Sequence, residues 1–189
     1  MFKLLSNLCR VAVLFALAGC VVGGAASRAT PVLGGVMNIG VPAGYCIDSK
    51  VSRETSDGVV MLMGRCTDAV KAKPALISVS VGQGGSAGVM TAGGPALTAF
   101  FNSGPGRAAL SRDGRAQNVK IVQALMAGDA FLMRLQDRNA GEYWRAVIGV
   151  KGRLVTVSAS GTEEVPLPQD QGKALVEITL DALRKANPV

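Results

Sequence analysis

The stretch that decides the fold reads Tyr143-Trp-Arg-Ala-Val-Ile-Gly-Val150, then Lys151-Gly152, then Arg153-Leu-Val-Thr-Val-Ser-Ala159. Two segments rich in β-branched residues flank a two-residue connection that contains glycine, which is typical of a tight β-hairpin. Pairing about this turn places seven side chains on one face, namely Trp144, Ala146, Ile148, Val150, Val155, Val157 and Ala159. We expect this face to form part of the core.

Five further strands are predicted before this hairpin. They cover residues 43–50, 58–66, 75–81, 119–125 and 130–136. In the third of them, apolar residues alternate with Ser78 and Ser80, which is the period of a half-buried strand. The last two flank Ala127-Gly-Asp129 and therefore form a second hairpin.

Two helices complete the prediction. The first covers residues 95–102, follows a glycine-rich loop at 82–95 and is stopped by Gly104-Pro-Gly106. One further helical turn is expected at 107–112. The second helix covers 168–186, because its apolar residues recur at helical spacing and basic residues lie near its end.

The element order is three strands, a helix, four strands and a terminal helix. It predicts an α+β fold, an α/β sandwich in which an antiparallel sheet of about six or seven strands carries two helices packed on one face. This order resembles the PsbP/Mog1-like α/β sandwich, which is used by many small exported and lipid-anchored proteins.

The N-terminus has the features of an export signal. Lys3 and Arg10 bracket a short basic region, and the apolar run after Arg10 is shorter than the roughly 20 residues of a spanning helix. Leu17-Ala-Gly-Cys20 resembles the lipobox of bacterial lipoproteins. The resemblance implies that residues 1–19 are a signal peptide and that Cys20 receives a diacylglyceryl group and an acyl chain such as palmitate.

Lipidation at Cys20 would hold the protein on a membrane, since each buried CH₂ contributes about 0.8 kcal/mol. Residues 20–38 are then expected to be a flexible tether, and residues 39–189 a single globular domain. Val21 in place of Asp favours the outer over the inner membrane. The alternatives are secretory cleavage near residues 24–26 and an uncleaved anchor.

The remaining cysteines form a candidate pair. Cys9 leaves with the signal and Cys20 is lipidated, so Cys46 and Cys66 are left in an oxidising compartment, on either side of a predicted hairpin turn at 52–58. A disulfide is predicted. The alternative is two free buried thiols, and a redox-active pair is disfavoured because there is no Cys-x-x-Cys spacing.

Four short segments resemble an uncharacterised family of Gram-negative envelope lipoproteins. They are Gly44-Tyr-Cys-Ile-Asp48, Arg107-Ala-Ala-Leu-Ser-Arg-Asp-Gly114, Tyr143-Trp-Arg-Ala146 and Ala186-Asn187. The resemblance implies a location in the envelope and a fold, and it transfers no catalytic residue.

Sequence motifs for catalysis are incomplete. The 189 residues contain no histidine, which removes the commonest general base and the commonest zinc ligand. Gly84-Gly-Ser-Ala-Gly88 matches the nucleophile elbow, and Gly82-Gln-Gly-Gly-Ser-Ala87 matches a dinucleotide fingerprint. Both lack the helix and partner residues that the chemistry needs. Residues 137–142 lack the ligands of a calcium loop. We expect no catalytic residue, no metal and no cofactor.

The net charge of +7 is partly concentrated in one segment. Arg107, Arg112, Arg115 and Lys120 lie near a single acidic residue, and they form a candidate patch for anionic lipid headgroups or lipopolysaccharide. The alternative is a solvated loop without a ligand. Nucleic acid is not expected as a partner, because export separates the protein from it.

These observations favour a non-catalytic protein of the cell envelope that is lipid-anchored, faces the periplasm, and binds a protein partner or supports envelope integrity. One alternative is a carrier of a small apolar ligand in a cavity between sheet and helices, under the loop at 82–95. The other is a periplasmic hydrolase that uses two of the carboxylates Asp48, Asp57 and Asp68.

Overall fold

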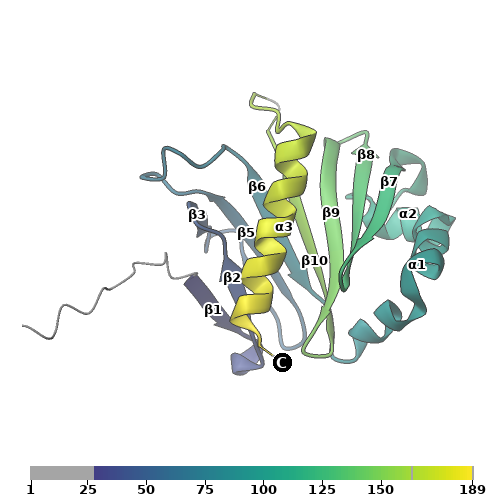
Figure 1. Cartoon of the computed structure of the whole chain (residues 1–189), viewed down its shortest axis with the longest axis horizontal. Coiled ribbons are helices and arrows are strands. Elements are labelled where there is room, and N and C mark those ends of the chain that lie inside the picture. The colour runs from purple at the N-terminus through teal and green to yellow at the C-terminus, as the bar shows by residue number, and fades with distance from the viewer. Residues whose placement is uncertain (1–27, 163, 189) are drawn as a thin grey trace, which may run out of the picture.

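The computed structural model describes residues 28–162 and 164–188 (Figure 1). Its strands are β1 (Arg28–Val32), β2 (Met37–Val41), β3 (Tyr45–Ile47), β4 (Arg53–Glu54), β5 (Val59–Arg65), β6 (Leu76–Val81), β7 (Val119–Ala127), β8 (Ala130–Asp137), β9 (Gly141–Val150) and β10 (Arg153–Ser160). Its α-helices are α1 (Gly93–Asn102), α2 (Gly104–Leu110) and α3 (Gln169–Ala186). Short 3-10 helices cover Leu33–Gly35, Ser86–Ala92 and Ala116–Asn118.

The strands form one large antiparallel sheet and one small one. The large sheet has the order β3-β5-β6-β10-β9-β8-β7, with β4 also paired to β5, and β1 and β2 form a separate antiparallel pair. β6 and β10, which are far apart in the sequence, lie side by side with Ser78 opposite Ser158. The predicted fold class, α+β with an antiparallel sheet and helices packed on it, is confirmed.

Helix α3 covers one face of this sheet (Figure 1). It packs against β2, β9 and β10, and it buries Leu175, Val176, Leu180 and Leu183 in the main apolar core. All seven side chains that the β9–β10 hairpin was predicted to place on one face are buried there. The predicted core face is therefore confirmed.

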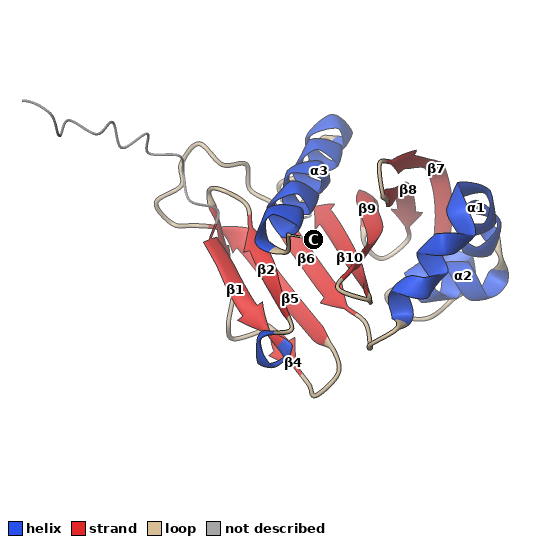
Figure 2. Ribbon diagram, turned by 60° about the horizontal axis from the view of Figure 1, so that its bottom comes forward, coloured by secondary structure: helices blue, strands red, loops and turns tan. Residues whose placement is uncertain are grey.

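Helices α1 and α2 pack on the opposite face, beside β7 (Figure 2). The expectation of two helices on one face is wrong, and strand β8 shows why. Phe131 and Met133 face α1 and α2, while Leu132 between them belongs to the core under α3. Because successive side chains of a strand point to opposite faces, this continuous apolar run needs a helix layer on each side.

Residues 28–38 are not a tether. β1 pairs with β2 in register, with Val32 opposite Met37, and both of these side chains are buried. Gly34 and Gly35 have positive φ angles and form a tight turn between the strands. Residues 28–38 thus belong to the folded domain, so the predicted boundary at residue 39 is wrong. The signal at 1–19, Cys20 and the rest of the predicted tether lie outside the described residues.

The Gly104-Pro-Gly106 segment begins a helix instead of only stopping one. Ser103 caps α2, its Oγ accepting a hydrogen bond from the Gly106 amide at 3.2 Å, and proline lies in the first turn. Proline is tolerated there because the amides of a first turn have no helical partner. The segment therefore separates α1 from a second short helix.

Candidate functional site

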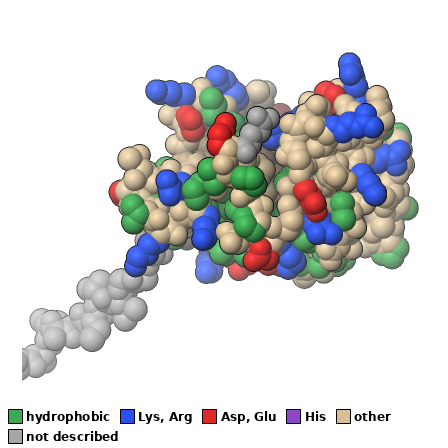
Figure 3. All heavy atoms as spheres, turned by 90° about the horizontal axis from the view of Figure 1, so that it is seen from above, with side chains coloured by type: hydrophobic (Ala, Val, Ile, Leu, Met, Phe, Trp, Pro, Cys, Tyr) green, Lys and Arg blue, Asp and Glu red, His purple; other side chains and the backbone are tan. Residues whose placement is uncertain are grey.

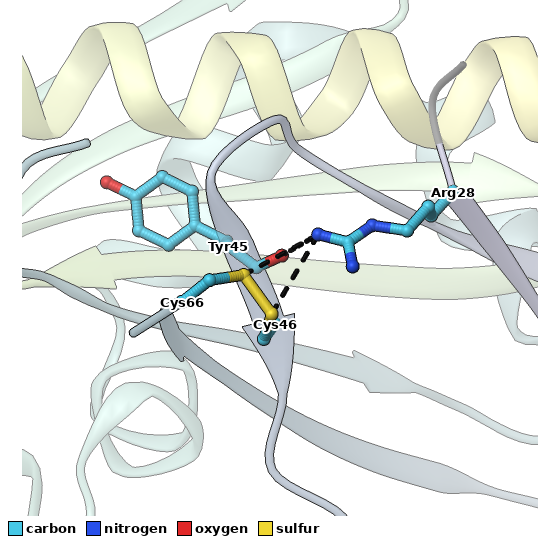
Figure 4. The surroundings of a disulfide bond; sticks show 4 residues. All are labelled: Arg28, Tyr45, Cys46 and Cys66. Atoms are coloured by element: carbon cyan, nitrogen blue, oxygen red, sulfur yellow. Dashed lines mark hydrogen bonds between the residues drawn. A yellow bond between two sulfur atoms is a disulfide. The ribbon is translucent and has the colours of Figure 1, made fainter. Parts of the chain in front are cut away.

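The predicted Cys46–Cys66 disulfide is present, with a Cα–Cα distance of 5.1 Å (Figure 4). It joins β3 to the residue that follows β5, and it crosses the pair diagonally because Cys46 lies opposite Gly64. Arg28 of β1 reaches the same place. Its Nη2 donates to the Tyr45 carbonyl at 3.0 Å and to the Cys66 sulfur at 3.5 Å. The disulfide thus ties β3 to the end of β5 within the large sheet. Arg28 joins the small sheet to the same edge.

A polar surface lies on the face of the large sheet opposite α3. Cross-strand register places Leu62, Ser78, Ser158 and Arg145 in one row from β5 through β6 and β10 to β9. Ser80 lies opposite Thr156 in the next row, and Ser160 opposite Leu76 in the row on the other side. We call this surface the serine face and define it by Ser78, Ser80, Ser158 and Ser160.

A cleft of about 340 Å³ lies over the serine face. Besides the four serines it is lined by three apolar side chains of β5 and β6, by Tyr143 and Arg145 of β9, and by Arg112 from the segment after α2. Two neighbouring concavities share lining residues with it. One of about 600 Å³ shares Arg112 and Ser160, and one of about 480 Å³ shares Ser80. We call the 340 Å³ part the central cleft.

Arg145 is held in place at the wall of the central cleft. Its Nε donates to Ser158 Oγ at 3.0 Å, its Nη1 donates to the Leu110 carbonyl at 3.0 Å, and the guanidinium lies 5.5 Å from the centroid of the Tyr143 ring. The two bonds connect β9 to β10 and to the end of α2. The guanidinium is therefore fixed before any ligand arrives.

The positive charge of the central cleft is uncompensated among its lining residues. Within residues 28–162 and 164–188, neither Arg112 nor Arg145 forms an ion pair, and no carboxylate lines this cleft. Glu142 lines the adjoining 600 Å³ concavity, but it is paired with Arg134 at 3.2 Å. The central cleft is thus suited to a negatively charged group.

Tyr143 is another polar group of this cleft. Its side chain is only 4% exposed, and within the described part of the chain its hydroxyl has no hydrogen-bond partner. Burial raises the pKa of Tyr143 above its ordinary value; the charges of Arg145 and Arg112 oppose this rise and that of Asp137 adds to it. The hydroxyl is therefore protonated at neutral pH and able to donate a hydrogen bond.

The four basic residues of the predicted patch have different roles. Arg107 donates to the backbone carbonyls of Asn102 and Ala116, so it connects α2 to the end of α1 and to the 3-10 helix that follows α2. Arg112 lines the central cleft, whereas Arg115 and Lys120 are exposed. On the face seen in Figure 3, lysine and arginine side chains are spread out and do not gather in one cluster.

The three carboxylates considered for hydrolysis do not come together. Asp48, Asp57 and Asp68 are exposed, and they follow β3, precede β5 and follow β5, respectively. Asp57 is paired with Arg153 at 2.8 Å, and this hydrogen bond holds the pKa of its carboxyl below the ordinary value, aided by the Gly84 amide. A general acid needs the opposite shift.

The two apolar clusters lie between the sheet and the helices, one under α3 and one under α1 and α2. Three residues of the 82–95 loop, Gly82, Gln83 and Ser86, line the 480 Å³ concavity beside the serine face. In the described ranges, no three His, Cys, Asp or Glu side chains are grouped as metal ligands would be. None of the described helices has both the length and the apolar character needed to cross a bilayer.

The sequence patterns did not predict that Arg145, Tyr143 and the four serines line one cleft. The signal was present in part, since Ser78 and Ser80 alternate with apolar residues. The adjacency of β6 and β10 turns this alternation into a shared polar surface, and the predicted hairpins do not specify that adjacency.

No family model matches the chain, and no curated protein matches it in sequence. It is similar in structure to the Saccharomyces cerevisiae Ran-binding protein Mog1p, with a TM-score of 0.42, 13% identity, and coverage of 86% of this chain and 94% of that one. A mutant of protein Mog1 gives a TM-score of 0.40, 12% identity, and coverage of 86% and 95%. Both TM-scores lie below 0.5, so the similarity supports no inference about binding.

Proposed function

We propose that this chain is a lipid-anchored protein of the bacterial cell envelope that faces the periplasm and binds a ligand without transforming it. The lipobox-like Leu17-Ala-Gly-Cys20 supplies the anchor, and Val21 favours the outer membrane. The serine face supplies the binding surface. The proposal thus combines an N-terminal targeting signal with a binding site on the folded domain.

The Cys46–Cys66 disulfide is the observation that best supports a periplasmic location. Disulfides persist in oxidising compartments such as the periplasm and are rare in the cytosol. Cys66 is buried, and Arg28 donates a hydrogen bond to its sulfur, so the bond is part of the packed structure and is not an exposed redox pair. Export through the N-terminal signal provides the conditions under which this bond forms.

Binding is favoured over catalysis by the composition of the central cleft. Its lining offers hydroxyl and guanidinium groups, which hold a ligand by hydrogen bonds and charge. It includes no carboxylate, cysteine or lysine to act as a base or nucleophile. Asp48, Asp57 and Asp68 lie in separate turns, so these three residues do not supply the pair of adjacent carboxylates that the hydrolase alternative requires.

Mass spectrometry of the mature protein from a Gram-negative host tests the anchor. We expect the chain to begin at an acylated Cys20 and to sediment with outer-membrane vesicles. Cys20→Ser removes the acceptor thiol and should release the protein from the membrane fraction, whereas Cys9→Ser is the matched control and should change nothing. A mature chain that begins after Ala26 and carries no lipid would contradict the proposal.

A further inference from the structure

We infer that the central cleft binds the oxyanion head of a small amphiphile, either a carboxylate or a phosphate, with Arg112 and Arg145 holding the head and the apolar side chains of β5 and β6 receiving the adjoining aliphatic segment. This inference rests on the proposed function, since it assigns a ligand class to the serine face. It does not depend on lipidation at Cys20.

The charge of the cleft selects an anion. Arg112 and Arg145 face it with no carboxylate in the lining and no ion pair elsewhere in the described residues. Arg145 uses Nε and Nη1 on Ser158 and Leu110, which leaves Nη2 for a ligand. The Nη2 group of a guanidinium held in this way can donate a charge-assisted hydrogen bond to an oxyanion.

The hydroxyl groups supply the remaining donors. Ser158 Oγ accepts from Arg145, so its own proton is free to be donated. The hydroxyls of Ser78, Ser80 and Ser160 line the same cleft. The buried Tyr143 hydroxyl has no hydrogen-bond partner within the described chain. A buried polar group without a partner is rare in proteins, and a bound oxyanion beside Tyr143 would accept from its hydroxyl.

The apolar side of the cleft accounts for the aliphatic segment. Val60 is 45% exposed and Leu76 is 37% exposed, and Leu62 lies in the same row as Ser78. These side chains and the two arginines line one cleft of about 340 Å³, a volume within the usual range for small-molecule sites. A ligand that is only charged would leave the apolar side chains in water.

Isothermal titration tests the inference on the mature, anchored chain in nanodiscs of a zwitterionic lipid. The probes are hexanoate, hexyl phosphate and uncharged hexanol. We expect both anions to bind and hexanol to bind at least about tenfold more weakly, because it cannot pair with the guanidinium groups. Equal binding of hexanol, or no binding of either anion, would overturn the inference.

Two substitutions test whether the anion binds in the central cleft. Arg112→Gln removes a charge from the cleft and should weaken the binding of hexanoate by about tenfold. Arg115→Gln is the matched control, since both arginines are exposed, lie in the same segment and differ in whether they line the cleft. Circular dichroism checks that both variants fold. If both variants bind like the original chain, the oxyanion does not lie in this cleft.

Vesicle flotation of the Cys20→Ser chain distinguishes the two sources of such a head group. Binding to phosphatidate vesicles that hexanoate displaces would assign the head group to a membrane lipid. Binding of hexanoate without flotation would assign it to a free metabolite, and both results support an oxyanion site. If lipidation at Cys20 fails while hexanoate still binds, only the proposed anchor is wrong.

Discussion

Asn187 follows the last turn of α3, and its side-chain amide bonds to the backbone of Asn38 in β2 as a neighbouring strand would. Its Oδ1 accepts from the Asn38 amide at 2.8 Å, and its Nδ2 donates to the Asn38 carbonyl at 2.7 Å and to the Leu183 carbonyl at 2.8 Å. The side chain is 8% exposed. One side-chain amide thus provides hydrogen-bond partners for the backbone amide and carbonyl of Asn38 and for a carbonyl in the last turn of α3.

Replacing Asn187 should therefore destabilise the fold. We expect Asn187→Ala to lower the free energy of unfolding by about 1–3 kcal/mol, since it leaves partly buried backbone groups of Asn38 without partners. Lys185→Ala, at an exposed position of the same helix, is the control and should stay within roughly 0.5 kcal/mol. Urea denaturation measures both. Equal stability of the two variants would show that water replaces these bonds at no cost.

At the scale of elements, the contact between β2 and α3 depends on a glycine. A Cβ placed on Gly40 would collide with the carbonyl oxygen of Ala182, so the strand backbone lies directly against the helix backbone. This contact joins the N-terminal pair of strands to the last helix of the chain. No side chain fits between them.

Gly40→Ala should consequently force β2 and α3 apart. We expect a loss of about 1–3 kcal/mol or more in the free energy of unfolding, as for overpacking in a core. Gly64→Ala is the matched control, because Gly64 is also a strand glycine but has open space where its Cβ would lie. Thermal denaturation of both variants checks this, and a Gly40→Ala variant as stable as Gly64→Ala would contradict the close contact.

Local patterns predicted most of the elements but not all of their packing. Alternation and the turn at Lys151-Gly152 define β9 and β10, and the spacing of apolar residues defines α3. β1 and β2 were missed because Gly34-Gly35 has the composition of a linker, although in this structure it forms a turn. The positive φ angles that distinguish the two are set by the pairing of Val32 with Met37, which is a tertiary effect.

At the scale of the whole molecule, the disulfide closes the loop between β3 and the end of β5, and Arg28 joins β1 to the same place. Replacing both Cys46 and Cys66 by alanine should lower the free energy of unfolding by about 3 kcal/mol, the loop-closure contribution for a loop of this length. Urea denaturation of the unmodified chain under reducing conditions should give the same shift. A reduced chain that is as stable as the oxidised one would contradict this assignment.

The site also depends on the whole molecule. Arg112 stood out in the sequence as one of four basic residues, yet the other three do not line the central cleft. Its actual partner, Arg145, comes from β9, and the hydroxyls come from β6 and β10. These groups meet only because the sheet order places β6 beside β10, a long-range pairing that local sequence patterns do not specify.

We propose that this protein binds its ligand on the serine face and not on the face under α3. Backbone amide shifts of the ¹⁵N-labelled chain, recorded during a titration with hexanoate, test it most directly. We expect the largest shifts in residues 76–80, 143–145 and 158–160, with little change in α3. Shifts concentrated on α3, or spread evenly over the surface, would contradict it.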